Sequence, residues 1–178
     1  LQEAVAGLLQ GGSSVDGSLD SLIDLASQGD VRDEVIQVQV GEQSILDHLV
    51  SNYVTNDAVS KSELEKVLNL LLVLAKSPKT ALKLVESDCR DGLVALLINH
   101  SNTDGVGEKT FVTTTLHIFN ALAMFKEIRP TLMKTGWLLQ EAIAIMGSEA
   151  ESHSKDQKVG ACTLVGTLAL DDEHRKSM

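Results

Sequence analysis

The side chains able to do chemistry form no catalytic or metal-binding constellation in this sequence. Histidines stand at positions 48, 100, 117, 153 and 174, and no two of them have the spacing of a metal-ligand pair. Asp171–Asp172–Glu173–His174 resembles a metal cluster, but a new helix is expected to begin there. Acidic residues at a helix start cap the backbone and favour the helix dipole. The sequence therefore predicts no enzyme, no metal site and no cofactor.

Three further stretches carry reactive residue types without the context that catalysis needs. Asp104–Lys109 is glycine-rich and ends in lysine, but it lacks the spacing and the preceding strand of a phosphate-binding loop. Ser60–Lys61–Ser62 and Ser152–Lys155 are expected in exposed loops, where no base would be held beside a serine. Cys162 is expected on the buried side of a helix as a small apolar residue, and Trp137 is expected to pack between units.

Composition excludes several classes of protein. The chain has 178 residues, of which 43% are hydrophobic, so it can bury a core and is not a disordered tail. The net charge of −10 and the five aromatic residues argue against nucleic acid as a partner. The longest apolar run, Val67–Ala75, is too short to insert across a membrane. Two cysteines and no visible signal segment favour a cytoplasmic protein, with the nucleus as a second location.

A repeated pattern organises the elements that would position these residues. An apolar helical stripe ending in Leu-Ala recurs four times, with its leucine at Leu25, Leu74, Leu122 and Leu168, so the spacings are 49, 48 and 46 residues. A constant period of this length is typical of helical repeat proteins. A polar corner follows each pair, and Ser77–Pro78 there predicts an N-cap with proline at the first helical position.

The remainder of each unit keeps the same phase. A short helix is expected after the corner, then a break at Gly41, near Asp88 and at Gly136, and then a second apolar helix. The second helices are expected at Ile45–Val50, Gly92–Ile98 and Leu138–Met146. Val35–Val40 alternates with period two and Thr113–Thr115 is β-branched, but the repeat predicts helix for both.

Three helices per unit, a glycine between the first two and a long third helix ending in Leu-Ala resemble the armadillo repeat. Ala161–Ala169 is similar to the family's third-helix signature, with Thr167 in place of its asparagine. The resemblance implies an all-α fold, a right-handed superhelical solenoid of about three repeats and a partial fourth. The expected units of this single domain are 1–14 (the end of a preceding helix), 15–60, 61–108, 109–154 and 155–178. A HEAT-type solenoid is the competing interpretation, and Leu1 as the first residue suggests a fragment of a longer chain.

The resemblance also implies a function, because third helices of armadillo proteins line a groove that holds an extended partner segment. Asp16, Asp20 and Asp24 recur every four residues opposite the apolar stripe of their helix. Carrying that phase along the repeats predicts a partner-binding groove formed by Asp16, Asp20, Asp24, Glu65, Asn69, Thr113, His117, Thr163 and Thr167. The same columns also contain Val73, Ala121 and Val159. An acidic end of this kind favours a basic or polar protein segment, although a solvated face without a partner would show the same pattern.

Two subfamilies are poorly matched. Importin-type proteins carry paired tryptophan and asparagine on the third helices, and no such pair occurs here. Catenin-type grooves are basic, whereas these columns carry no lysine or arginine. The sequence therefore predicts a non-enzymatic scaffold or adaptor, and the alternative is a chaperone cofactor that clasps a folded client. Self-association through the C-terminal end is also expected, because Leu164 and Leu168 would be less covered there.

Overall fold

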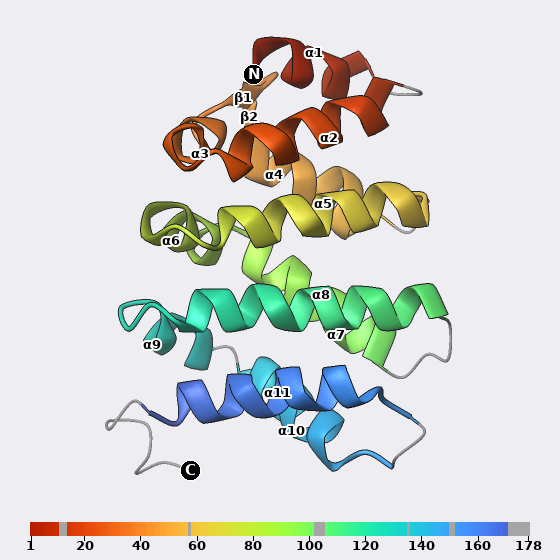
Figure 1. Cartoon of the computed structure of the whole chain (residues 1–178), viewed down its shortest axis with the longest axis vertical. Coiled ribbons are helices and arrows are strands. Elements are labelled where there is room, and N and C mark those ends of the chain that lie inside the picture. Colours follow the sequence, from red (N-terminus) through yellow and green to blue (C-terminus); the bar gives the residue numbers. More distant parts are fainter. Residues whose placement is uncertain (11–13, 57, 102–105, 135, 150–151, 171–178) are drawn as a thin grey trace. The chain divides into compact units, whose positions relative to one another are not determined.

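The structure, a computed structural model, describes residues 1–10, 14–56, 58–101, 106–134, 136–149 and 152–170. The described part of the chain is almost entirely helical (Figure 1). Its helices are α1 (Gln2–Gln10), α2 (Ser14–Ser27), α3 (Gly29–Val35), α4 (Ile45–Leu49), the π-helix η1 (Val50–Val54), α5 (Lys61–Leu74), α6 (Pro78–Glu86), α7 (Cys89–Ser101), α8 (Val106–Ala123), α9 (Arg129–Met133), α10 (Gly136–Gly147) and α11 (Lys155–Leu168). Two short strands, β1 (Gln39–Val40) and β2 (Gln43–Ser44), form an antiparallel pair.

The chain divides into two compact units, Leu1–Gly92 and Leu93–Met178, with the boundary inside α7. In the first unit α2 packs between α1 and α5, and α3 contacts α6. In the second unit α11 packs against both α8 and α10, while α9 contacts α8 and α10. The long helices that carry the predicted binding residues are thus neighbours within each unit.

The four Leu-Ala pairs end the four long helices, as the repeat predicts. Leu74, Leu122 and Leu168 are fully buried at the C-terminal ends of α5, α8 and α11, and in α2 it is Ala26 that is fully buried. Full burial of a leucine side chain contributes about 1.5–3 kcal/mol. The recurring pair therefore fixes where each long helix stops and which side of it faces the core.

Side chains from the following corner satisfy the free carbonyl groups at these helix ends. Arg32 Nε donates to the Ala26 carbonyl at 3.0 Å, and Arg129 Nε donates to the Ala123 carbonyl at 2.8 Å. Each arginine lies six residues after its acceptor, so the contact repeats in both units. A cation at a helix C-terminus is favoured by the helix dipole.

Serine side chains begin two of the long helices. Ser60 Oγ accepts the Glu63 backbone N–H at 3.2 Å, and the Ser60 N–H donates to Glu63 Oε2 at 3.1 Å. Ser154 and Gln157 form the same reciprocal pair, at 3.2 and 2.7 Å. The two serines therefore act as helix caps, a role that their S-x-x-[EQ] spacing signals. Pro78 is at the start of α6 after the N-cap Ser77, as predicted.

The helix predicted over Val35–Val40 is wrong, whereas that over Thr113–Thr115 is confirmed within α8. Helix α3 ends at Val35, and Val40 pairs with Gln43 across a two-residue turn. Gly41 begins this turn with a φ of +67°, a left-handed conformation that glycine adopts without steric cost. The predicted break at Gly41 is correct, and the alternating valines before it are better explained by the strand.

Three expectations about burial are also wrong. Cys162 is exposed on α11, and Trp137 is 68% exposed at the start of α10, so neither is a packing residue in this chain. Leu164 and Leu168, expected to be poorly covered, are fully buried. Cys89 is the buried cysteine, and burial is the main reason why its pKa is raised to about 12.

The glycine-rich stretch Asp104–Lys109 is partly helical, because α8 already begins at Val106. Asp104, Gly105 and the acidic cluster Asp171–His174 lie outside the described residues. Within the described residues, no three His, Cys, Asp or Glu side chains converge as a metal site would require. None of the described helices combines the length and the apolar character needed to span a bilayer.

Candidate protein-binding faces

The first unit carries an acidic face on the neighbouring helices α2 and α5. Asp16, Asp20 and Asp24 are exposed along α2, and Glu65 and Asn69 are exposed on α5. We call these five residues the acidic face. All five were predicted to line a partner-binding groove, and the structure places them on two helices that pack against each other.

Lys66, which the predicted columns omit, also lies on this face. Its Nζ lies 3.1 Å from Asp16 Oδ1 and 2.8 Å from Asp20 Oδ2, and it donates a further hydrogen bond to the Asp16 carbonyl. The hydrogen bond that Lys66 donates to Asp20 is the main cause of the raised pKa of Lys66. The row of aspartates on α2, which is unfavourable in an isolated helix, therefore helps to join α2 to α5.

One lysine cannot neutralise the whole face. Asp24 and Glu65 are exposed and have no ion pair within the described part of the chain, so the surface around them stays acidic. The predicted columns themselves carry no lysine or arginine, and Lys66 adds one cation beside them. The remaining charge still favours a partner with cationic groups.

In the second unit, a hollow of about 420 Å³ lies between α8 and α11. It is lined by Thr113, His117, Asn120, Asp156, Val159, Gly160 and Thr163, and we call it the α8–α11 hollow. Thr113, His117 and Thr163 are predicted site residues that the fold brings together. Thr167 lies one helical turn beyond Thr163 on α11 and does not line the hollow.

The threonine hydroxyls of this region are already used as donors. Thr113, Thr163 and Thr167 each donate to the carbonyl four residues earlier, at 2.8 Å in every case. Their oxygens keep lone pairs that can accept a hydrogen bond. The surface therefore offers acceptors and methyl groups, and it suits a partner that brings N–H donors.

Asn120 and Asp156 are polar residues of the hollow that were not among the predicted site residues. Asn120 is the one that joins the two helices. Its Nδ2 donates to the Gly160 carbonyl at 2.9 Å, which joins α8 to α11, while its Oδ1 is buried and accepts no hydrogen bond from any described residue. A buried acceptor without a partner lowers the stability of the fold. Asn120 stands two residues before Leu122, one residue ahead of the position used to define the columns.

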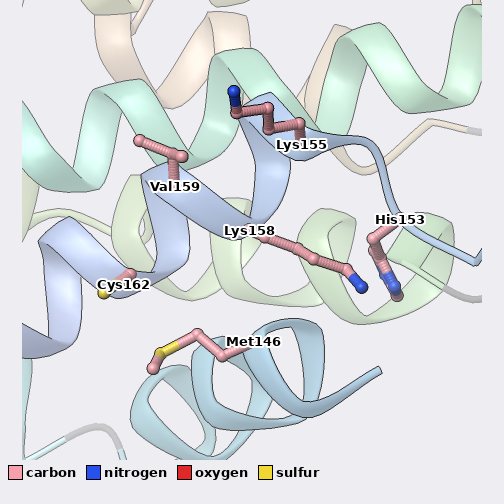
Figure 2. A pocket seen from close by; sticks show the side chains of 6 residues that line it. All are labelled: Met146, His153, Lys155, Lys158, Val159 and Cys162. Atoms are coloured by element: carbon pink, nitrogen blue, oxygen red, sulfur yellow. The ribbon is translucent and has the colours of Figure 1, made fainter. Parts of the chain in front are cut away.

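A second hollow, of about 460 Å³, lies between α10 and α11 in the same unit (Figure 2). It is lined by Met146, His153, Lys155, Lys158, Val159 and Cys162. Lys158 Nζ donates to the carbonyls of Ser148 and Glu149 at 2.7 and 2.9 Å, and so caps the end of α10. This hollow is apolar around Met146 and Cys162 and basic around the two lysines, unlike the acidic face of the first unit.

His153 is a structural residue of this second hollow and is 7% exposed. Its Nδ1 lies 2.9 Å from Ser148 Oγ, and its Nε2 is buried and makes no well-aligned hydrogen bond with a described residue. Burial is the main cause of a lowered pKa, although the nearby Ser101 backbone acts in the opposite direction. The hydrophobic periodicity of the sequence does not predict that His153 is buried, because the surrounding segment is polar.

Comparison with known proteins identifies the fold of the chain. No protein-family model matches the chain, and no curated protein matches it. A solved structure described as computationally designed armadillo repeat proteins for modular peptide recognition superposes with a TM-score of 0.75. The match covers 98% of this chain and 67% of the designed chain, at 16% sequence identity.

Identity this low establishes architecture alone, and the architecture agrees with the resemblance first read from the third-helix signature. The described part of the chain has four long helices that end at the Leu-Ala pairs, with shorter helices between them, and the superposition covers nearly the whole chain. The chain has the fold of an all-α, armadillo-type solenoid.

Proposed function

We propose that this chain is a non-enzymatic protein-binding scaffold or adaptor that holds a basic or polar segment of a partner on its long helices. The observation that carries the proposal is the clustering of predicted polar residues on exposed faces of paired long helices in both units. The solved armadillo structure supports it, because that design was made for peptide recognition.

The chemistry of both faces points to a partner rich in N–H donors. The acidic face presents carboxylates at Asp24 and Glu65, and the α8–α11 hollow presents Asp156 with accepting threonine oxygens. Lysine, arginine and exposed peptide N–H groups meet this requirement, whereas an acidic segment would be repelled.

The test uses fluorescence anisotropy with two labelled peptides of equal length, one alternating Lys and Ala and the other alternating Glu and Ala. We expect the lysine peptide to bind and its affinity to fall as sodium chloride is added. Asp24→Asn and Asp156→Asn should each weaken binding about three- to fivefold at low salt, since exposed charge pairs contribute up to about 1 kcal/mol.

Matched controls separate the faces from net charge. Glu34→Gln and Glu149→Gln each remove one exposed carboxylate elsewhere in the same units. Equal effects of the control and face variants would mean that only the overall charge matters, which would refute the proposed faces. Absence of binding by either peptide, while a folded client protein binds, would favour the alternative role as a chaperone cofactor.

A further inference from the structure

The two long helices of the second unit expose the same stripe to different extents. The repeat spacing of 46 residues aligns Lys158, Cys162, Val165 and Ala169, along α11 and its C-cap, with Val112, Leu116, Phe119 and Ala123 of α8. All four residues of the α8 stripe are buried. In contrast, Cys162 is exposed and the other three residues of its stripe are only half-buried. We call these four residues of α11 and its C-cap the stacking stripe.

The structure shows what covers the stripe on α8. Gly160 of α11 lies against Leu116 so closely that an added Cβ would be 3.4 Å from the Leu116 Cβ atom. Two hydrogen bonds bracket this crossing, from Gln157 Nε2 to the Lys109 carbonyl at 3.0 Å and from Asn120 to the Gly160 carbonyl. The buried stripe of α8 therefore packs against a helix that has a small residue, Gly160, at the point of closest approach.

The stacking stripe continues into exposed apolar side chains of α10. Ile143 is 51% exposed, and Met146 faces Cys162 across the second hollow (Figure 2). Lys155, at the rim of this hollow, is exposed and forms no ion pair with any other described residue. The matching partner is thus a helix with a small residue, an apolar residue and a carboxylate on one side.

Helix α1 has these three features on its exposed side. Glu3, Ala6 and Leu9 are exposed at successive steps of three residues, and Leu9 is 57% exposed. The unit that contains α1 has fifteen acidic and seven basic residues, so it is strongly negative. The opposite side of α1 is buried through Ala4, Val5 and Leu8, which leaves the exposed side available to another molecule.

We propose that the α10–α11 surface binds helix α1 of a second copy of this chain, with Ala6 at the stacking stripe and Glu3 beside Lys155. The contact joins two different surfaces, so it is heterologous and can extend beyond a dimer. Burying the exposed apolar side chains of both surfaces against each other favours this contact, and the Glu3–Lys155 pair gives it an orientation. This inference does not depend on the peptide-binding faces.

A charge swap tests the pairing by sedimentation velocity at low salt over a range of protein concentrations. Glu3→Lys and Lys155→Glu should each weaken self-association about three- to fivefold, because both place like charges together. An equimolar mixture of the two variants should restore association, since opposite charges then face each other again across the contact between the two chains. Lys126→Glu changes an exposed lysine of the same unit and should have little effect.

Crosslinking tests the geometry separately. With a short bismaleimide, Ala6→Cys should give a ladder of dimers, trimers and larger species, because the introduced thiol of one copy lies near Cys162 of the next. The wild-type chain should give no such ladder, because Cys89 is buried. A wild-type dimer joined through Cys162 on both copies, or a strictly monomeric chain at all concentrations, would overturn the proposal. Failure of the mixed charge variants to associate would also overturn it.

Discussion

Single residues show where a helical pattern predicts well and where it cannot. Periodicity identifies the side of α11 on which Cys162 lies, but whether that side is buried depends on a neighbour that the helix itself does not specify. Leu116, the equivalent residue on α8, is fully buried because α11 covers it. No described helix covers Cys162 in the same way, and its side chain is exposed. Trp137 is exposed for the same reason, since the aromatic character of a residue does not show that another helix packs on it.

His153 gives a prediction about pH at the residue scale. Burial favours the neutral imidazole, so the folded-state pKa lies below the unfolded value of about 6.5. The contribution of neutral His153 to the free energy of unfolding is fully present above the unfolded-state pKa. It is lost as the pH falls from that value towards the lower folded-state pKa. Urea unfolding of the wild type should therefore show a steeper loss of stability between about pH 7 and pH 5 than His153→Gln.

The environment of His153 is mixed, and the control has to separate it from the other histidines. Lys158 and Lys109 disfavour its protonation, whereas Glu141 and the Ser101 backbone favour it. Burial also lowers the pKa of His48, so the difference between wild type and His153→Gln should persist when both carry His48→Gln. Equal slopes for the wild type and His153→Gln would show that this histidine does not contribute.

At the scale of elements, the repeat pattern correctly predicts the long helices, but it wrongly predicts a helix for the segment between α3 and α4. The Leu-Ala period sets the ends of α2, α5, α8 and α11 because the buried apolar stripe dominates their free energy. Val35–Val40 has no such apolar helical stripe. Its alternating pattern instead fits a short strand pair, in which Val40 is buried. Gly41, which readily adopts a positive φ, is the local sequence feature that favours a tight turn after a strand over a continuous helix.

Two glycines give a matched prediction for these elements. Gly41 has a φ of +67°, so Gly41→Ala should lower the free energy of unfolding by about 1 kcal/mol. Gly17 lies inside α2 with open space around its Cβ position, and Gly17→Ala should raise stability by about 0.5–1 kcal/mol. Urea denaturation measures both, and a Gly41→Ala variant as stable as the wild type would exclude strain at this turn.

The candidate site could be predicted only as far as helix phase allows. Phase places Thr113, His117 and Thr163 on one side of their helices, and the hollow brings them together. It does not show that Lys66 crosses from α5 to the aspartates of α2, because that contact depends on how two helices pack. Asn120 was missed for a similar reason, since its amide joins two helices rather than following one helix.

At the scale of the whole molecule, charge is distributed unevenly between the two units. Leu1–Gly92 contains fifteen acidic and seven basic residues, while Leu93–Met178 contains ten acidic and eight basic residues. Like charges in excess destabilise a compact state through repulsion. The composition reveals this asymmetry, but the boundary inside α7 that divides it could not be read from the repeat period.

The asymmetry predicts that moderate salt stabilises the chain at neutral pH. Raising sodium chloride from about 10 mM to about 0.3 M shortens the screening length below the spacing of many exposed carboxylates, so the Tm should rise by a few degrees. Screening also weakens exposed pairs such as Lys79 with Asp33, but exposed pairs of this kind contribute little to stability. Near the isoelectric point of about 4.8 the rise should disappear.

Hydrogen exchange resolves the same effect along the chain. The gain in protection with salt should be larger for amides in Leu1–Gly92, because the excess of carboxylates is concentrated there. An equal gain in both units would mean that salt acts through general solvation rather than through repulsion. A Tm that falls with salt at neutral pH would show that attractive pairs such as Lys66 with Asp16 and Asp20 outweigh the net charge.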